Sequence, residues 1–375
     1  MTAVSRAATV PLVKENGLTA VAMSGGVDSS VAAGLLAREG RPLVGFSMQL
    51  LDRLAGEEER YGRCCSPDDF RDARAVADRL GVPHYVLDME EEFRRHVLEP
   101  FASGYARALT PSPCVGCNTF LKFGALLSRA RMVGAARVAT GHYAILERDR
   151  ATGRTLLRRA VDDGKDQSYF LFDLSEEQRR AAEFPLGRMK KEDVRVVARE
   201  IGLPTAEKPE SMDLCFVSRG GDYREFLASR SLAAPDGEGE IVDAAGRVLG
   251  RHDGISAFTV GQRRGVGVAS GRRLYVLRIE EGTRRVVVGE ETELLREECT
   301  IERTRWIPFE RLSGTLKAVV KIRSSHGGIG ATITDAGDGR ARIRFDEPQR
   351  AVTPGQAAVL YDGDLVLGGG WIAAG

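Results

Sequence analysis

The sequence predicts an α/β domain built on a doubly wound parallel sheet, followed by a small β-rich central domain and a C-terminal β-barrel. In the first part of the chain, short apolar runs alternate with segments of helical periodicity, as in parallel strands joined by crossover helices. Later, Val/Ile/Leu runs are separated by Gly- and Asp-rich turns, which is typical of barrels. We therefore expect domains at 1–219 (with 1–17 as an N-terminal extension), 220–297 and 298–375.

In the first domain, each expected strand is a short apolar run and each expected helix carries apolar residues at helical spacing. The expected strands are 18–23, 43–51, 84–87 and 137–140, and the expected helices are 28–39, 67–80, 91–108, 117–131 and 190–201. Gly40 and Gly81 follow two of these helices, where glycine commonly ends a helix. A hairpin over 144–161 is expected to turn at 151–153.

The second half of the chain contains only short β segments. We expect strands at 240–242, 274–279, 285–288, 318–322, 331–334, 341–345 and 357–361.

Composition excludes several classes of protein. With 43% hydrophobic and 29% charged residues, the 375-residue chain is globular and long enough for two or three cores. The net charge of +1 leaves room for a local basic groove. Because the sequence has no secretory leader and no apolar window of membrane-spanning length, we expect a cytoplasmic protein with no membrane contact.

The segment Met23–Ser30, between the first strand and the first helix, has the chemistry of a phosphate loop. Gly25 and Gly26 permit close backbone approach, and the helix N-terminus presents N–H groups to an anion. Asp28 would repel bare phosphate, so it indicates a bound Mg²⁺. The loop lacks the GxxxxGK[ST] pattern of ordinary P-loops. A turn that merely caps the helix is the structural alternative.

Two further positions lie where a nucleotide binds in such sheets, at the carboxyl ends of the strands. Met48 ends the second strand and Gly141 follows the fourth, so both are candidates for contact with the nucleotide. A lone methionine is more often a core residue.

Six cysteines in a chain of this length do not suggest a disulfide scaffold, so their spacing is the informative feature. Cys114 and Cys117 form a CxxC pair in a proline-rich loop, and Cys215 stands far along the chain. We expect Cys117 near a helix N-terminus, which would favour its thiolate. Thiols together with a phosphate-binding loop suggest sulfur chemistry.

Seven segments together resemble the bacterial tRNA-specific 2-thiouridylases, members of the N-type ATP pyrophosphatase superfamily, and the similarity runs from Leu18 through the rest of the chain. The segments are Ser24–Ser29, Thr110–Asn118, Ala139–Tyr143, Lys165–Phe170, Cys215–Phe216, Gly250–Gly254 with Thr259–Arg263, and Thr353–Gln356. The resemblance implies an adenine nucleotide α-hydrolase-like fold and ATP-dependent conversion of a wobble uridine to 2-thiouridine. It also implies tRNAs of the Lys, Glu and Gln type as substrates, a persulfide-bearing donor protein and a monomer.

The resemblance also assigns roles to residues. The nucleophile aligns with Cys117 and the persulfide carrier with Cys215. The positions that align with ATP contacts are Ala22, Met23, Ser24, Gly25, Gly26, Val27, Asp28, Ser29, Met48 and Gly141. The positions that align with contacts to the target base or the tRNA are Ser112, Pro113, Cys114, His142, Lys165, Asp166, Gln167, Arg323, Ser324 and Gln356.

Two departures from the family pattern affect the site. Ser stands at position 112 where Asn is usual, which shortens the reach of that side chain. Cys stands at position 114 where Asp is usual, so Cys114, Cys117 and Cys215 could instead hold a [4Fe-4S] cluster with an open iron. A zinc site with His142 as fourth ligand is a weaker alternative. The adjacent Cys64 and Cys65 are expected to be loop residues, with sulfur relay by these vicinal thiols as the alternative, and Cys299 is expected to be buried or incidental.

The expected mechanism joins these parts. ATP and Mg²⁺ activate the C2 oxygen of the uridine as an adenylate, and sulfur from Cys215 replaces it with help from Cys117. The pairs Arg263/Arg264 and Arg272/Arg273 are candidates for phosphate contact or for solvated turns. Two alternatives of other classes stay open, namely a small-molecule ATP pyrophosphatase of the amidotransferase type and an RNA-binding protein with a vestigial nucleotide loop.

Overall fold

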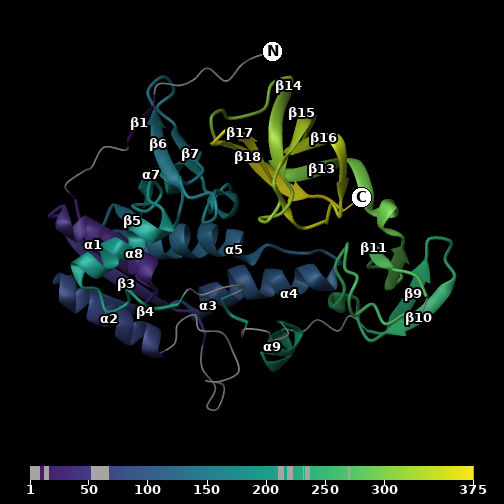
Figure 1. The fold of residues 1–375 in the computed structure, drawn as a ribbon, viewed down its shortest axis with the longest axis horizontal. Coiled ribbons are helices and arrows are strands. Elements are labelled where there is room, and N and C mark those ends of the chain that lie inside the picture. The colour runs from purple at the N-terminus through teal and green to yellow at the C-terminus, as the bar shows by residue number, and fades with distance from the viewer. Residues whose placement is uncertain are drawn as a thin grey trace.

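The computed structural model describes residues 9–11, 17–51, 67–209, 215–217, 223–230, 232, 237–268 and 271–374. Figure 1 shows an α/β unit on one side of the molecule, a barrel beside it and a small sheet domain at the far end, with long helices running beneath the barrel. The predicted fold class is confirmed, because the described chain folds as a parallel sheet with helices, a small sheet and a barrel.

The parallel sheet has the strand order β4-β3-β2-β5-β8. Every neighbouring pair is parallel. The bounds are β2 Thr19–Ala22, β3 Leu43–Gln49, β4 His84–Asp88, β5 Arg137–Ala139 and β8 Ala182–Glu183. The central strand β2 is fully buried, since helices cover both of its faces. All four predicted strands of this sheet are present.

Helices cover the sheet on two faces, as a doubly wound topology requires. Val21 and Met23 face one hydrophobic cluster with α1 (Val27–Arg38), α2 (Pro67–Leu80) and α8 (Lys191–Ile201). Ala20 and Ala22 face the opposite cluster, which contains the helices between β4 and β5. The period of two along β2 therefore places alternate residues against different helix layers.

The second helix layer consists of two long helices, each with a wider π turn in its middle. The first runs through α3 (Glu90–Phe93), η1 (Arg94–Leu98) and α4 (Glu99–Ala106). The second runs through α5 (Pro113–Gly116), η2 (Cys117–Ala125) and α6 (Leu126–Met132). The expectation that this helix begins at Cys117 is wrong. It begins at Pro113, because proline lacks only an N–H that the first turn leaves unpaired anyway.

The predicted hairpin is present as β6 (Ile145–Asp149) and β7 (Thr155–Arg158), but it does not join the parallel sheet. It extends the sheet of the barrel, through Arg158 paired with Leu365, and β1 (Thr9–Pro11) pairs with its outer edge. Two short helices follow, η3 (Ser168–Phe170) and α7 (Glu176–Ala181). The hairpin thus attaches the nucleotide domain to the barrel.

The central domain is a four-stranded sheet with the order β10-β9-β12-β11. Its elements and the helix before it are α9 Tyr223–Ser229, β9 Gly239–Asp243, β10 Val248–His252, η4 Ile255–Ala257, β11 Tyr275–Glu280, β12 Arg285–Gly289 and η5 Glu291–Leu294.

The C-terminal strands form a closed barrel, because β18 pairs with both β13 and β17. The strands are β13 Leu295–Trp306, β14 Thr315–Lys321, β15 Ile329–Gly337, β16 Arg340–Arg350, β17 Ala357–Asp362 and β18 Leu365–Ile372. Across the residues that the structure describes, there is no helix with the length and apolarity needed to span a membrane.

Candidate active site

The phosphate loop connects β2 to α1 and is held by hydrogen bonds among its own serines. The Ser29 hydroxyl accepts from the Ser24 N–H at 3.1 Å and donates to the Gly26 carbonyl at 3.1 Å. A Cβ on Gly26 would meet only the Ser24 hydroxyl, at 3.4 Å, so the fold itself tolerates a side chain there. Close approach of a bound phosphate is a physical reason for glycine at this position.

Gly25 has a different constraint. Its φ is +71°, and a Cβ would lie 2.3 Å from the Asp69 carbonyl of α2. Lys208 also connects the loop to α2, since its ammonium donates to the Gly25 carbonyl at 3.0 Å and to the Asp69 carboxylate at 2.8 Å. Burial lowers the pKa of Lys208, but its bonds to Asp69 and Asp72 more than offset this, so the pKa is raised and the lysine stays charged. The loop is therefore preorganised.

Asp28, in the first turn of α1, faces two groups from other elements. Lys191 Nζ donates to both carboxylate oxygens, at 2.6 and 2.8 Å, and the Tyr143 hydroxyl donates to one of them at 2.8 Å. Carboxylate oxygens are the ligands that Mg²⁺ prefers, so Asp28 fits the predicted role of holding Mg²⁺ beside phosphates. Lys191 brings a positive charge to the same point.

The segment Gly141–Tyr143 joins the phosphate loop to the cysteine-bearing helix. A Cβ on Gly141 would lie 2.7 Å from the Asp28 carbonyl carbon and the Ser29 nitrogen, so only glycine lets this strand end reach α1. Tyr143 bonds Asp28, as described above. Between them, His142 turns the other way and contacts Lys122 on η2, with 3.3 Å between Nε2 and Nζ.

His142 is buried at the centre of a polar network on that helix. Burial, reinforced by the charge of Lys122, lowers the pKa of His142 well below its usual value, so the ring is neutral at pH 7. Because the ammonium of Lys122 can only donate, Nε2 accepts and Nδ1 carries the proton that goes to the Thr140 hydroxyl at 2.7 Å. Lys122 also donates to Asn118 at 3.0 Å, and Asn118 donates to the Phe170 carbonyl at 3.0 Å.

The predicted catalytic cysteines pack into the same hydrophobic cluster. Cys117 is buried and is the fifth residue of its continuous helix. The helix-terminus argument for Cys117 is therefore wrong, because the effect of a helix end fades within one turn. Cys215 is half-buried, and its neighbour Phe216 packs edge-on against Phe93 and Phe101, at ring separations of 5.8 and 5.4 Å.

Phe216 thus fixes Cys215 against the helix that passes Cys117. The backbone of His96, in the π turn of that helix, lies 3.3 Å from where a Cβ on Gly116 would be. Gly116 allows this close crossing directly before Cys117.

The metal alternatives find no support in this geometry. Over the part of the chain that the structure describes, no three His, Cys, Asp or Glu side chains gather as a metal site. This leaves the three-thiolate cluster and the zinc site without a ligand set. Burial, with the charge of Glu298, raises the pKa of Cys299 to about 12, as expected of an inert thiol. Cys64 and Cys65 lie outside the described residues.

The remaining predicted nucleotide and base contacts are placed as follows. Met48 is half-buried against the core cluster at the end of β3. Ala22, Met23 and Val27 are buried where β2 passes into α1. Ser112 occupies the N-cap position of the cysteine helix without a side-chain capping hydrogen bond, and Pro113 and Cys114 are the first two residues of that helix; all three are half-buried.

The predicted tRNA segment Lys165–Gln167 is a tight loop held by its own polar groups. Asp166 accepts from the Ala160 and Ser168 backbone N–H groups, each at 3.1 Å. Gln167 accepts from the Tyr143 N–H at 3.0 Å. Two of the three side chains therefore shape the loop, and Lys165 is half-buried.

The barrel contributes the other predicted tRNA positions. Arg323 and Ser324 are exposed on the turn after β14. Burial and the neighbouring Tyr361 raise the pKa of the Tyr169 hydroxyl beside the Lys165 loop, and the positive charge of Arg323 offsets part of this increase. Gln356 donates its side-chain amide to the Thr110 carbonyl at 3.2 Å, and the Thr110 N–H donates to the Pro354 carbonyl at 2.8 Å. Two hydrogen bonds thus connect the barrel to Thr110, in the segment Thr110–Ser112 that leads into the cysteine helix; this segment is called the cysteine loop below.

Sequence reasoning missed Tyr143, Lys191 and Lys208 as members of the site. The position of Lys191 in the sequence could have indicated its role in the site. A lysine in the first turn of a helix opposes the helix dipole, where acidic residues are preferred, so it needs another reason to be there. Lys208 stands in an irregular segment whose position only the tertiary fold defines.

The fold and the site define a HUP-type nucleotide-binding domain that carries two β domains. Residues 18–219 match the family model described as "tRNA methyl transferase HUP domain", 224–290 match its PRC-barrel domain, and 296–372 match an "Aminomethyltransferase beta-barrel domain". The chain is also 49% identical over 365 residues to the tRNA-specific 2-thiouridylase MnmA of Solibacter usitatus, covering 94% of this chain and 98% of the relative.

Further relatives agree with this match. The tRNA-specific 2-thiouridylase MnmA of Koribacter versatilis is 48% identical, covering 94% of this chain and 98% of the relative. That of Geobacter metallireducens is 49% identical, covering 94% and 96%. The chain belongs to the tRNA-specific 2-thiouridylase family.

Proposed function

We propose that this protein is an ATP-dependent tRNA sulfurtransferase that converts the wobble uridine to 2-thiouridine. The observation that carries the proposal is the segment Gly141–Tyr143, which contacts the phosphate loop through Asp28 and the cysteine helix through Lys122. One short segment therefore connects the phosphate loop to the helix that carries Cys117. The full-length similarity to 2-thiouridylases supports the same chemistry.

The first step is activation of the base. The C2 oxygen of the uridine attacks the α-phosphate of ATP, a P–O bond forms, and pyrophosphate leaves. The loop Ser24–Ser29 binds the phosphates through its N–H groups and hydroxyls, as helix N-termini do. Lys191 stabilises negative charge on the departing pyrophosphate. Mg²⁺, held by Asp28, supplies further charge neutralisation when bound.

The second step exchanges oxygen for sulfur. Cys215 carries a persulfide received from a donor protein. The Cys117 thiolate attacks the inner sulfur of that persulfide, a Cys117–Cys215 disulfide forms, and hydrosulfide is released. Hydrosulfide adds to C2, the C2–O bond breaks, and AMP leaves with 2-thiouridine as the other product. A thiol reductant then reduces the disulfide, which resets both cysteines.

Two features of the partners follow from this scheme. The protein requires an RNA whose target base is unstacked, because base pairing would hide C2. It requires a protein that donates persulfide sulfur, since each turnover transfers the outer sulfur of the Cys215 persulfide to the base. We propose tRNAs of the Lys, Glu and Gln type as substrates, a monomeric enzyme and a cytoplasmic location.

Nucleoside mass spectrometry tests the proposal. The purified protein is incubated with ATP, Mg²⁺, a persulfide donor and unmodified tRNA, and both 2-thiouridine and AMP are measured. Wild type should form both, whereas Cys117→Ser and Cys215→Ser should form no thiouridine. Cys299→Ser is the matched control and should keep full activity. Thiouridine formation by either of the first two variants would exclude the disulfide scheme, and its absence from wild type would exclude the function.

A further inference from the structure

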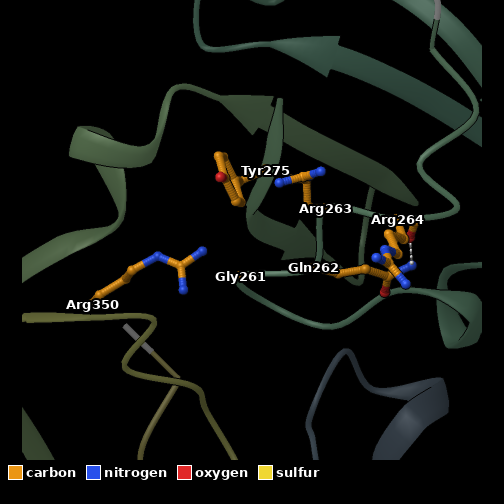
Figure 2. Close-up of a pocket in the computed structure, with 6 residues that line it drawn as sticks. All are labelled: Gly261, Gln262, Arg263, Arg264, Tyr275 and Arg350. Carbon is orange, nitrogen blue, oxygen red and sulfur yellow. Dashed lines mark hydrogen bonds between the residues drawn. The ribbon is translucent and has the colours of Figure 1, made fainter. Parts of the chain in front are cut away.

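A pocket lies between the central domain and the barrel, away from the phosphate loop and the cysteines. Its volume is about 470 Å³, within the range of sites that hold a small ligand or part of a larger one. Figure 2 shows Arg350 extending from the barrel toward the central domain, where a loop carries residues 261–264 and β11 begins with Tyr275. The lining residues are Gly261, Gln262, Arg263, Arg264, Tyr275 and Arg350.

The pocket concentrates positive charge. Arg263 and Arg264 are exposed, and among the described residues neither guanidinium has a carboxylate within ion-pair distance. Arg350 adds a third guanidinium, 5.0 Å from the centre of the Tyr275 ring, and a single carboxylate, Glu291, balances it at 3.0 Å. Like charges held together repel one another, so an anion between them would be attracted.

The loop that carries these arginines is rigidly built. The Gln262 side chain accepts from the Thr259 N–H and donates to the Arg264 carbonyl, both at 3.0 Å (Figure 2). Gly261 has a φ of +86°, and a Cβ there would lie 2.7 Å from the Ala351 Cβ of the barrel. The central domain and the barrel approach so closely here that only glycine fits at position 261. The backbone positions of the two arginines are therefore set before a ligand arrives.

We propose that this pocket binds phosphate groups of the tRNA backbone and so fixes the central domain and the barrel on the RNA together. The inference rests on the proposed function and adds to it a defined anion site with a residue from each domain. Guanidinium forks match phosphate oxygens in two-point contacts. The described residues that line the pocket include no aliphatic side chain, and Arg350 already covers the Tyr275 ring, which favours a backbone phosphate over the adenine of a free nucleotide.

Equilibrium binding of full-length unmodified tRNA over a series of salt concentrations tests the proposal. Removal of one phosphate contact should lower the slope of log K against log salt by ~0.7 to ~0.9. The double variant Arg263→Gln/Arg264→Gln should show this reduction together with weaker binding. ATP binding should be unchanged. The matched control is the double variant Arg247→Gln/Arg278→Gln, whose arginines lie in the same domain, pair with Asp243 at 2.9 Å and Glu280 at 3.1 Å, and are outside the pocket.

An unchanged salt slope in the double variant, or an equal change in the control, would overturn the proposal. Competition by AMP or inorganic phosphate at concentrations too low to screen the RNA would also overturn it, by identifying a small-anion site instead. Failure here differs from failure of the proposed function. If the protein forms 2-thiouridine at saturating tRNA but the double variant has the same salt slope as wild type, the proposed function stands and only the phosphate site is refuted.

Discussion

The contact between the barrel and the cysteine loop predicts that Gln356 acts on turnover more than on tRNA affinity. Gln356→Ala removes one neutral hydrogen bond, from the side-chain amide to the Thr110 carbonyl at 3.2 Å. Such a bond contributes about 0.5–1.5 kcal/mol. At 1.4 kcal/mol per factor of ten, the ordered form of the loop loses about two- to twelvefold in population. We expect kcat for thiolation to fall by that factor.

Gly355→Ala is the stronger change at the same contact. Gly355 has a φ of +85°, and a Cβ would lie 2.9 Å from both the Leu109 Cβ and the Thr110 nitrogen. Gly363→Ala is the matched control, because its φ is also positive, at +59°, but no atom lies within 4 Å of the added Cβ. Both substitutions cost about 1–2 kcal/mol of backbone strain. Only the first displaces the cysteine loop.

The assay is 2-thiouridine formation at saturating and at limiting tRNA, with thermal unfolding as the stability control. We expect Gly355→Ala to lose the most kcat, Gln356→Ala to lose less, and Gly363→Ala to lose the least. The KM for tRNA should stay nearly constant in all three variants. A raised KM with normal kcat in Gln356→Ala, and normal activity in Gly355→Ala, would refute the reasoning. That outcome would support Gln356 as a direct tRNA contact, as the family resemblance predicts.

Three further predictions concern the nucleotide side of the site. Lys191→Met removes the cation beside Asp28 and should slow AMP formation by about 10²-fold while tRNA binding is retained; normal AMP release would exclude its role. Gly141→Ala forces a Cβ to within 2.7 Å of the α1 backbone and should cost about 1–3 kcal/mol of unfolding free energy and weaken ATP binding, whereas Gly282→Ala, with no atom within 4 Å, should be silent. Stability should fall as the pH drops below about 6.5, because the unfolded chain protonates His142 while the folded protein, with its lowered pKa, keeps the ring neutral; thermal unfolding of His142→Gln should show a smaller pH dependence, and an equal one would contradict this.

Local patterns in the sequence predict the helices and strands well, because the hydrophobic period of a strand or a helix is set by residues close together in the chain. The four parallel strands and the hairpin follow from apolar runs and turn residues. The cysteine helix starts earlier than its apolar pattern predicts, since Pro113 resembles a loop residue although proline is compatible with a first helical turn. The same error places the predicted helix terminus at Cys117.

The site was predictable where the chemistry lies within one segment. The phosphate loop and the cysteine segments can be read directly, because each carries its own residue types and spacing. The contacts of Lys208 and Gln356 cannot be read, because their partners Gly25 and Thr110 lie far away in the chain and meet them only through the packing of α2 and of the barrel. Arg350 joins Arg263 and Arg264 for the same reason.

The barrel supports the candidate active site in addition to its proposed contact with RNA. Arg350, at the end of β16, lines the arginine pocket, and Gln356, six residues later, holds Thr110 at the start of the cysteine loop. Between them, the Ala351 N–H donates to the Leu294 carbonyl at 3.2 Å and its side chain packs against Gly261, so this segment has little freedom to move independently. A displacement of the arginine end is therefore transmitted to the Thr110 end. RNA phosphate in the pocket would stabilise the position of Thr110, just before the helix that carries Cys117, and this would link docking of the tRNA to the placement of that thiol.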